Sequence, residues 1–418
     1  MSKVNASIIT IGDELLIGQV VDTNSSWIAQ ELNKIGVAVK HRVAVGDVWQ
    51  DIWDALDEES KKADIILITG GLGPTADDIT KPLLCEYFNG KMVVDQETLS
   101  HITYLFEEVF RRPMIERNAK QAEVPDTCTV LKNEKGTAPG MLFKRDGNIF
   151  VSMPGVPHEM KWIMTNHVLP MIPDLYQTGY IEHRTLLTAG IGESFLAELI
   201  REFEAALPAH VKLAYLPNFG MVRLRLSSWG LDQDILNKEL DNLFNSLKTN
   251  VKEHLVIDED LPIEMVVGKL LKERKETVAT AESCTGGYIA HLLSIHPGSS
   301  AFFTGTIVSY ANIIKERLLG VSHETLTTVG AVSEETVVQM AKAVRETMQT
   351  TYSIAVSGIM GPEGATDEKP VGLVWVAIAS KDQVVTRSFR FRFDRRRNID
   401  LTAVNALNML RSMIVDNS

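Results

Sequence analysis

Residues 277–287 run Thr277-Val278-Ala279-Thr280-Ala281-Glu282-Ser283-Cys284-Thr285-Gly286-Gly287. The β-branched start and the small, hydroxyl-bearing end predict a strand, a tight turn and the start of a helix. Such a turn can lift a hydroxyl nucleophile out of a sheet while the first N–H groups of the helix face the same point. We therefore interpret Ser283 as a nucleophile, with an oxyanion site at the N–H groups of Thr285, Gly286 and Gly287. The alternative is that Ser283 only caps the helix.

The composition limits the classes of protein to consider. A chain of 418 residues predicts two to three domains at about 150 residues per domain. A net charge of −12 disfavours a broad nucleic-acid or anionic-membrane surface, because such surfaces rely on clustered Lys and Arg. The three cysteines, Cys85, Cys128 and Cys284, have no C-x-x-C spacing, so we expect neither a disulfide framework nor a cysteine zinc site.

Targeting and membrane segments are not expected. The N-terminus enters a strand-like run without a basic region and a long apolar stretch, so no secretory signal is predicted. Apolar runs such as Ile65–Ile68 have only strand length. We expect a cytoplasmic protein that does not enter a membrane.

The first part of the chain alternates strands and helices. The periodicity predicts, in order, a strand, a helix, a strand, a helix and a strand at Ile8–Ile11, Ser25–Ile35, Ala38–Val45, Trp49–Ser60 and Ile65–Thr69. This pattern is typical of a parallel, doubly wound sheet that binds ligands at the carboxyl ends of its strands.

Glycines and carboxylates follow two of these predicted strands. Gly12-Asp13-Glu14 and Asp22-Thr23-Asn24 follow the first, and residues 70–80, which include Gly71, Gly73, Thr75, Asp77 and Asp78, follow the third. A glycine-rich turn lets the backbone approach a phosphate, and carboxylates can hold a bridging divalent cation. We therefore predict metal ligands at Asp13, Asp77 and Asp78. The alternative is a long turn whose aspartates only help the next helix to start.

Three further segments favour a ligand site over a simple turn. They are Arg117–Ala122, Gly136–Gly140 and Met153–Met160, the last of which contains Gly155 and again follows a predicted strand. We predict that Gly71, Gly73, Thr75, Asn24 and Gly155 bind the substrate of this domain.

The rest of the chain predicts two more domains. Strands at Arg184–Ala189 and Val222–Ser228 and helices at Ser194–Ala206 and Asp232–Thr249 predict a small α+β module. The acidic stretch Asp258-Glu259-Asp260-Leu261-Pro262 then marks a linker. We place the domain boundaries at residues 1–172, 173–257 and 258–418.

The last domain is predicted to be another α/β sandwich. We expect strands at 277–280, Gly305–Tyr310, Ser353–Val356, Val371–Ala379 and Val384–Phe393. We expect helices at Ile263–Arg274, Asn312–Leu319, Glu334–Gln349 and Asn398–Ile414.

The chemistry of the last domain centres on Ser283. Without a histidine at a strand end, the candidate base is Lys315, provided that burial lowers its pKa. Tyr310 could relay or orient the proton. The alternative for Lys315 is a solvated lysine, which is the more common fate of this residue type. Arg395 or Arg397 could bind a phosphate monoester, and a solvated basic edge is the competing interpretation.

These motifs resemble the full-length CinA family over nearly the whole chain. The resemblance is carried by the following segments: Gly12–Leu15, Asp22–Asn24, Gly70–Thr75 with Asp77 and Asp78, Asn133 with Gly136–Gly140, Pro154–Pro157 and Ala281–Gly287. It implies a MoaB/MogA-like, molybdopterin-binding-like N-terminal domain, a KH-like α+β middle domain and a C-terminal nicotinamide-nucleotide amidohydrolase domain.

The resemblance also implies activities and site residues. The C-terminal domain is expected to convert nicotinamide mononucleotide to nicotinate mononucleotide and ammonia without a cofactor. Ser283, Ser300, Tyr310 and Lys315 fall where the family has its active-site residues, and Gly358 is expected to bind substrate. The N-terminal domain is expected to be a metal-dependent ADP-ribose pyrophosphatase, and the protein a homodimer.

The chain departs from the family pattern at two points. Met360 stands where a small residue is usual, and Phe393-Asp394-Arg395 replaces the more common Gly-Asp-Arg. A different class of function stays open for the N-terminal domain, which could bind a pterin or nucleotide as a sensor or partner surface without hydrolysing it.

Overall fold

The computed structural model describes residues 3–75, 78–218 and 220–416. Its elements divide into two compact units, Met1–Glu182 with Ser227–Leu240, and His183–Leu226 with Asp241–Ser418. None of the helices in the described residues is both long and apolar enough to span a bilayer.

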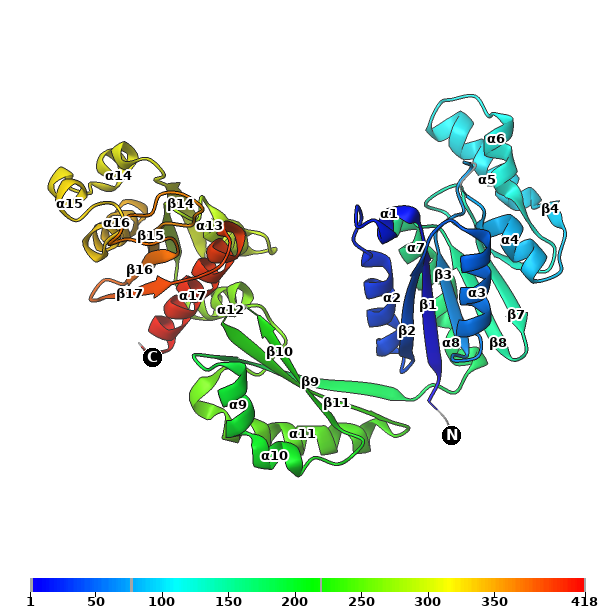
Figure 1. Ribbon diagram of the computed structural model, residues 1–418, viewed down its shortest axis with the longest axis horizontal. Helices are drawn as coiled ribbons and strands as arrows, with labels where there is room; N and C mark the ends of the chain where they lie inside the picture. The colour runs from blue at the N-terminus through cyan, green and yellow to red at the C-terminus, as the bar shows by residue number, and fades with distance from the viewer. Residues whose placement is uncertain (1–2, 76–77, 219, 417–418) are drawn as a thin grey trace. The chain divides into compact units, whose positions relative to one another are not determined.

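The N-terminal domain is built on a six-stranded sheet in the order β2-β1-β3-β8-β7-β6 (Figure 1). Its strands, with a separate two-stranded sheet β4-β5, are β1 (Asn5–Ile11), β2 (Ala38–Val45), β3 (Ile65–Thr69), β4 (Met92–Val94), β5 (Glu123–Pro125), β6 (Thr129–Leu131), β7 (Gly140–Arg145) and β8 (Asn148–Met153). Strands β2, β1, β3 and β8 are parallel, as predicted for the first three of them. At the other edge β7 pairs antiparallel with β8, and β6 pairs antiparallel with β7.

Helices cover both faces of this sheet. They are α1 (Asp13–Leu16), α2 (Thr23–Lys34), α3 (Trp49–Glu59), α4 (Thr80–Tyr87), α5 (Gln96–Tyr104), η1 (Leu105–Val109), α6 (Glu116–Ala119), η2 (Lys120–Ala122), α7 (Pro157–Ile163), η3 (Met164–Val168) and α8 (Leu169–Leu175). Alternate strand residues point to opposite faces. Ile8 packs in a cluster with α2 and α7, whereas Ile9 packs in a second cluster with α3 and α4. The predicted double winding is thereby confirmed.

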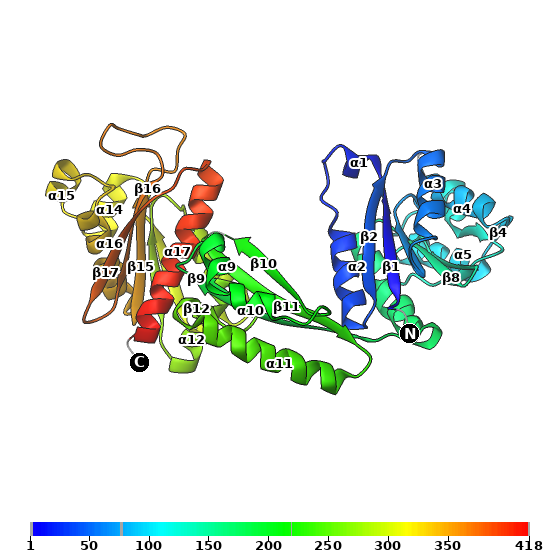
Figure 2. The ribbon, with the colours of Figure 1, turned by 60° about the horizontal axis from the view of Figure 1, so that its bottom comes forward.

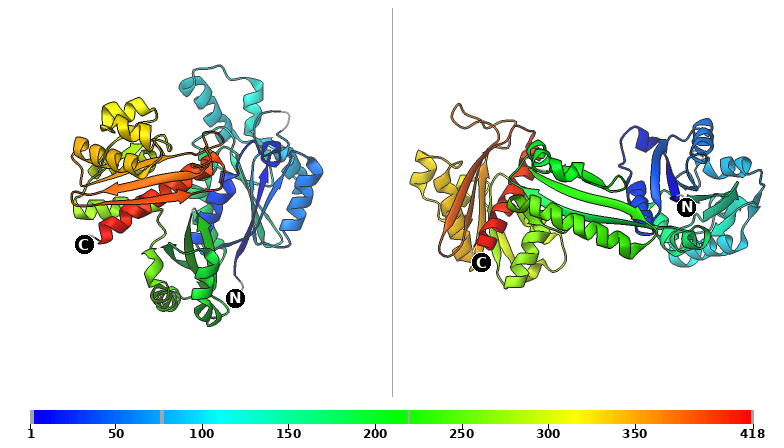
Figure 3. Two further views of the ribbon diagram at one scale, coloured as in Figure 1. Left: turned by 60° about the vertical axis from the view of Figure 1, so that its left-hand side comes forward. Right: turned by 90° about the horizontal axis from the view of Figure 1, so that it is seen from below.

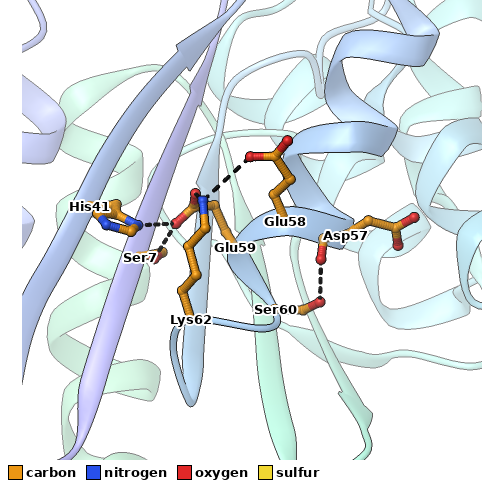
Figure 4. Close-up of polar contacts among 7 residues, drawn as sticks. All are labelled: Ser7, His41, Asp57, Glu58, Glu59, Ser60 and Lys62. Atoms are coloured by element: carbon orange, nitrogen blue, oxygen red, sulfur yellow. Dashed lines mark hydrogen bonds and ion pairs between the residues drawn. The ribbon is translucent and has the colours of Figure 1, made fainter.

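A buried carboxylate ties β1, β2 and α3 together (Figure 4). Glu59, only 3% exposed, accepts hydrogen bonds from Ser7 Oγ (2.7 Å) and Lys62 Nζ (2.9 Å), and His41 Nδ1 lies 2.8 Å away. Burial alone would raise the pKa of Glu59, but the hydrogen bonds of Lys62, Ser7 and His41 outweigh it and hold that pKa below its ordinary value. The ionised form of Glu59 therefore stabilises this fold.

The middle sheet has the order β10-β11-β9-β12. Its elements are β9 (Tyr180–Ala189), α9 (Glu193–Leu199), α10 (Arg201–Ala205), β10 (Lys212–Asn218), β11 (Met221–Gly230), α11 (Gln233–Asn250), η4 (Lys252–His254) and β12 (Leu255–Ile257). The single helix predicted over Ser194–Ala206 is two helices that meet at Ile200.

The C-terminal sheet has the order β14-β13-β15-β16-β17. Its domain comprises α12 (Ile263–Arg274), β13 (Val278–Glu282), α13 (Tyr288–Ser294), η5 (Ser299–Ala301), β14 (Phe303–Val308), α14 (Asn312–Leu319), α15 (His323–Thr328), α16 (Glu334–Met348), β15 (Tyr352–Gly358), β16 (Leu373–Ala379), β17 (Val384–Arg390) and α17 (Arg395–Asp416). Strands β14, β13 and β15 are parallel, and β16 and β17 are antiparallel additions.

Helices again cover both faces of the C-terminal sheet. Figures 2 and 3 show α17, in red, lying along one face, where Leu407 joins the same core cluster as Val356 and Val267 of α12. On the other face, Val344 of α16 packs in a cluster with Ala355 of β15. This α/β sandwich leaves the carboxyl ends of β13, β14 and β15 side by side, where a ligand site is expected.

We predict that Glu59→Gln lowers the free energy of unfolding by about 1–3 kcal/mol at neutral pH, because buried donors lose an acceptor. The folded-state pKa of Glu59 is lowered, so its stabilisation is present above the ordinary carboxyl pKa and is lost as the pH falls through the folded pKa. The difference between wild type and variant should therefore shrink in acid. Urea unfolding at neutral and acidic pH measures it, with the exposed Glu86→Gln as control. A difference that grows in acid would contradict the interpretation.

Candidate active site

Ser283 follows directly after the carboxyl end of β13, an interior strand of the C-terminal sheet. Strand β13 is buried along its whole length between β14 and β15. The Ser283 N–H donates to the carbonyl of Val356 (3.1 Å), and the Ser309 N–H donates to the carbonyl of Glu282 (2.8 Å). The backbone of the predicted nucleophile is thereby held on both sides.

Lys315 points its amine at Ser283. It projects from α14, which follows β14, and its side chain is only 1% exposed. Nζ lies 3.0 Å from Ser283 Oγ and donates to the carbonyl oxygens of Ser309 (2.7 Å) and Tyr310 (3.2 Å). Burial lowers the pKa of Lys315. The structure therefore supports a buried lysine next to the serine over a solvated one.

This geometry suits a neutral amine. A neutral lysine has two hydrogens and one lone pair, and the carbonyls of Ser309 and Tyr310 can accept the two hydrogens. The lone pair then remains for the hydroxyl hydrogen of Ser283. A serine paired in this way with a base is an activated nucleophile.

Cys284, beside the serine, is not a competing nucleophile. Its side chain is buried, and burial raises its pKa to about 12. Because the thiolate is the nucleophilic form of cysteine, Cys284 stays an inert thiol near neutral pH.

A carboxylate that the sequence analysis did not single out organises the turn. Glu282 is fully buried. Its Oε2 accepts from the Thr285 hydroxyl (2.7 Å) and from the N–H groups of Gly287 (3.1 Å) and Ile289 (3.0 Å). Its Oε1 accepts from the Thr280 hydroxyl (3.1 Å) and the Ala290 N–H (2.8 Å). The available signal was an acidic residue at the end of an otherwise apolar strand.

Glu282 changes the position expected for the oxyanion site. The Gly287 N–H is taken by Glu282, and the Gly286 N–H donates to the carbonyl of Ser283 (3.2 Å). Helix α13 begins at Tyr288 rather than Thr285. In the described part of the chain, the Thr285 N–H has no recorded acceptor, and the only interaction recorded for the Cys284 N–H is with the thiol of the same residue. Of the predicted oxyanion donors, Gly286 and Gly287 are therefore engaged within the turn, and the N–H groups nearest the serine are those of residues 284 and 285.

Tyr310 and Arg395 lie beside the serine and lysine. The Tyr310 hydroxyl accepts from Arg395 Nη2 (3.0 Å), and Arg395 Nη1 donates to the carbonyl of Gly361 (2.9 Å). Tyr310 is 62% exposed and contacts Lys315 through its carbonyl oxygen. Its hydroxyl is thus paired with an arginine, in place of the proton relay to Lys315 that we expected.

Three other predicted residues have different places. Ser300 lies in η5, which precedes β14; because β13 and β14 are parallel, it is at the sheet end opposite Ser283. The structure therefore does not bring Ser300 to the site. Arg397 stacks over the Phe393 ring (4.4 Å) and lines a separate cavity of about 740 Å³. Gly358 ends β15, where a Cβ would lie 2.7 Å from Val374 Cγ2, so close packing explains this glycine.

The N-terminal domain has its own cavity, of about 460 Å³, where β1, β3 and β8 end. Gly71, Gly73 and Gly155, three of the predicted substrate-binding residues, line it. Asn24 lines a smaller neighbouring pocket and donates to the carbonyl of Gly155 (2.7 Å). The side chain of Thr75 is hydrogen-bonded to Asp78.

The structure describes two of the three predicted metal ligands, Asp13 and Asp78. Asp78 accepts from the N–H groups of Gly73 (2.8 Å) and Thr75 (2.8 Å), which orders the loop and occupies its oxygens. Asp13 Oδ1 instead accepts from the Asp47 N–H (3.2 Å). Asp77 lies outside the described residues.

Across the residues that the structure describes, no group of three or more His, Cys, Asp or Glu side chains could hold a metal ion. The oxygens of Asp78 accept from the backbone of its own loop, and Asp77 lies outside the described residues, so the metal site at Asp13, Asp77 and Asp78 stays a prediction.

Three family models match consecutive parts of the chain. The model described as a probable molybdopterin binding domain matches residues 7–174, the damage-inducible protein CinA KH domain matches residues 183–256, and the CinA C-terminal domain matches residues 260–414. CinA-like proteins of Flavobacterium psychrophilum and Cytophaga hutchinsonii are each 44% identical over 413 residues, which is 99% of this chain and 99% of each relative. This chain belongs to the CinA-like family.

Membership of the CinA family confirms the predicted fold class. The N-terminal domain matches the model of a probable molybdopterin binding domain, the middle domain is the CinA KH domain and the last is the CinA C-terminal domain. Among solved structures, the competence/damage inducible protein CihA from Agrobacterium tumefaciens is 38% identical to this chain, with a TM-score of 0.35. The match covers 37% of this chain and 99% of the CihA chain.

We predict that Glu282→Gln destabilises this CinA C-terminal domain. One oxygen becomes an NH₂ group, so at least one buried donor of the turn loses its acceptor, at a cost of about 1–3 kcal/mol. The shift of the urea unfolding midpoint measures the effect. Glu335→Gln, an exposed change in the same domain, is the control. Equal midpoints for the two variants would show that the turn does not depend on the carboxylate.

Proposed function

We propose that the C-terminal domain is a nicotinamide-nucleotide amidase, which hydrolyses nicotinamide mononucleotide to nicotinate mononucleotide and ammonia. The observation that carries the proposal is the buried Lys315 Nζ, 3.0 Å from Ser283 Oγ at the carboxyl end of β13. Membership of the CinA family supports it, because that resemblance implies this reaction.

The reaction needs no cofactor. Neutral Lys315 takes the hydroxyl proton as Ser283 Oγ attacks the carboxamide carbon, and the carbonyl oxygen becomes an oxyanion that the N–H groups of Cys284 and Thr285 can receive. Lys315 then returns the proton to the leaving ammonia as the C–N bond breaks. Water, deprotonated by the same amine, hydrolyses the acyl-serine ester and restores the hydroxyl.

Arg395 is the proposed contact for the substrate phosphate. Its guanidinium lies next to the site through Tyr310 and Gly361, and it is exposed. Arginine suits phosphate because its fork of N–H groups matches the oxygens. Arg397, which lies in the other cavity, is the less suitable of the two predicted arginines.

The N-terminal domain is the second candidate site. Its glycine-lined cavity favours a phosphate-bearing ligand, since backbone can approach the phosphates closely there. We propose that it binds and cleaves ADP-ribose. A divalent ion held by Asp13, Asp77 and Asp78 stays part of the prediction, no step is assigned to it, and ligand binding without cleavage is the alternative outcome.

We predict that Ser283→Ala and Lys315→Met each lower kcat for ammonia release from nicotinamide mononucleotide by at least about 1,000-fold, because nucleophile and base act as one unit. Ammonia release by the purified full chain measures it. Lys342→Met, which removes an exposed lysine of α16, should keep wild-type activity.

The pH profile gives an independent test of the base. Because burial lowers the pKa of Lys315, kcat should rise as the pH increases through that lowered pKa and level off above it. Full activity of Ser283→Ala would refute the nucleophile, and an unchanged pH limb in Lys315→Met would refute the base.

For the N-terminal site, we predict that Asp78→Ala lowers ADP-ribose cleavage at least about 10-fold, because the loop from Gly73 to Thr75 loses its acceptor. Release of AMP by the full chain with Mg²⁺ present measures it. Ammonia release should be unaffected, since that site is in another domain. ADP-ribose binding by the wild type without AMP release would favour the sensor.

A further inference from the structure

Two motifs that the proposed chemistry does not yet use meet in the N-terminal cavity. The first motif is Asn133 with the segment Gly136–Gly140, and the second is the segment Met153–Met160. They meet at the carboxylate of Glu159. Glu159 lies in the first turn of α7 and lines the cavity of about 460 Å³. Asn133 Nδ2 donates to Glu159 Oε2 at 2.6 Å.

The surroundings of Asn133 fix its orientation. Asn133 is 3% exposed, its Nδ2 also donates to the carbonyl of Ala138 (2.8 Å), and its Oδ1 accepts from the Lys135 N–H (3.0 Å). Both amide hydrogens and the amide oxygen therefore have partners. A buried amide held in this way keeps one N–H directed at the carboxylate.

The backbone at Gly136 makes room for this carboxylate. A Cβ built on Gly136 would lie 2.0 Å from Glu159 Oε2, so any side chain there would displace Glu159. The described residues provide one donor, Asn133, to Oε2 and none to Oε1. One oxygen of Glu159 is thus held in place while the other is free to accept a proton.

The other carboxylates of the cavity have different contacts. Asp78 accepts two backbone N–H groups within its own loop, Asp47 accepts from the Asp13 N–H (3.3 Å), and Glu14 is exposed to solvent. Burial raises the pKa of Glu159, which makes it a stronger base than an exposed carboxylate.

We infer that Glu159 is the general base of the N-terminal site and that Asn133 is its positioning residue. The inference rests on the proposed cleavage of ADP-ribose. The oxygen of a water molecule attacks one phosphorus, and Glu159 Oε1 takes the proton. The bond from that phosphorus to the bridging oxygen breaks, and the leaving phosphate keeps the electron pair. The products are AMP and ribose 5-phosphate.

The decisive variant is Glu159→Gln in the full chain, assayed with ADP-ribose and Mg²⁺. The remaining amide oxygen can still accept from Asn133, so we expect the fold to be kept. We expect kcat to fall at least 100-fold with KM within threefold, and the acid limb of the pH profile to disappear. Ammonia release from nicotinamide mononucleotide should be unchanged, which shows that the effect is confined to the N-terminal site. Glu116→Gln, an exposed change in the same domain, is the matched control.

The possible outcomes separate the two claims. If the wild type cleaves ADP-ribose and Glu159→Gln cleaves it at a rate within threefold of the wild type, the inference about Glu159 is overturned and the proposed pyrophosphatase stands. A wild type that cannot cleave ADP-ribose would overturn the proposed pyrophosphatase and this inference with it. If Glu159→Gln also loses ammonia release, Glu159→Asp decides. A kcat at least 10-fold above that of the glutamine variant supports a base, and equal rates overturn it.

Discussion

The removal of the Lys315 amine from water is the constraint on which the C-terminal site depends. An ammonium group at this depth loses its hydration. Among the described residues its hydrogen-bond partners are two carbonyl oxygens and the Ser283 hydroxyl, with no carboxylate. Burial therefore shifts lysine toward its neutral, basic form. The carbonyls come from Ser309 and Tyr310, directly after β14, so the parallel pairing of β13 with β14 brings base and nucleophile together.

Much of this arrangement could be predicted because the signals are local. The strands Ala38–Val45 and Ile65–Thr69 and the helices Ile263–Arg274 and Asn312–Leu319 have the predicted bounds. Strand direction is not local. The apolar pattern of β7 or β16 is the same whichever way the strand runs, so the antiparallel edges of both large sheets were outside what periodicity can show.

The order of the strands predicts where Ser283 and Lys315 lie. It does not predict which N–H groups and carboxylates already have hydrogen-bond partners. Ser283 and Lys315 each follow a strand of one parallel pair, so both must lie at its carboxyl end. The same logic, applied to the start of β14, places Ser300 at the other end. Whether an N–H group or carboxylate is free depends on its partners in three dimensions, which is why the roles of Glu282 and Asp78 could not be read from residue type.

The carboxylates of Glu282, Asp78 and Glu159 differ in the number of hydrogen bonds that they accept, and this difference explains their different roles. Glu282 accepts five hydrogen bonds, from β13, the turn after it and the start of α13, so all its lone pairs are engaged and it holds this segment in place. Asp78 is close to that limit, with both oxygens bonded to its own loop. Glu159 accepts one bond from Asn133 and lines an open cavity. The number of donors that reach a carboxylate thus separates those that shape a site from the one that can exchange protons in it.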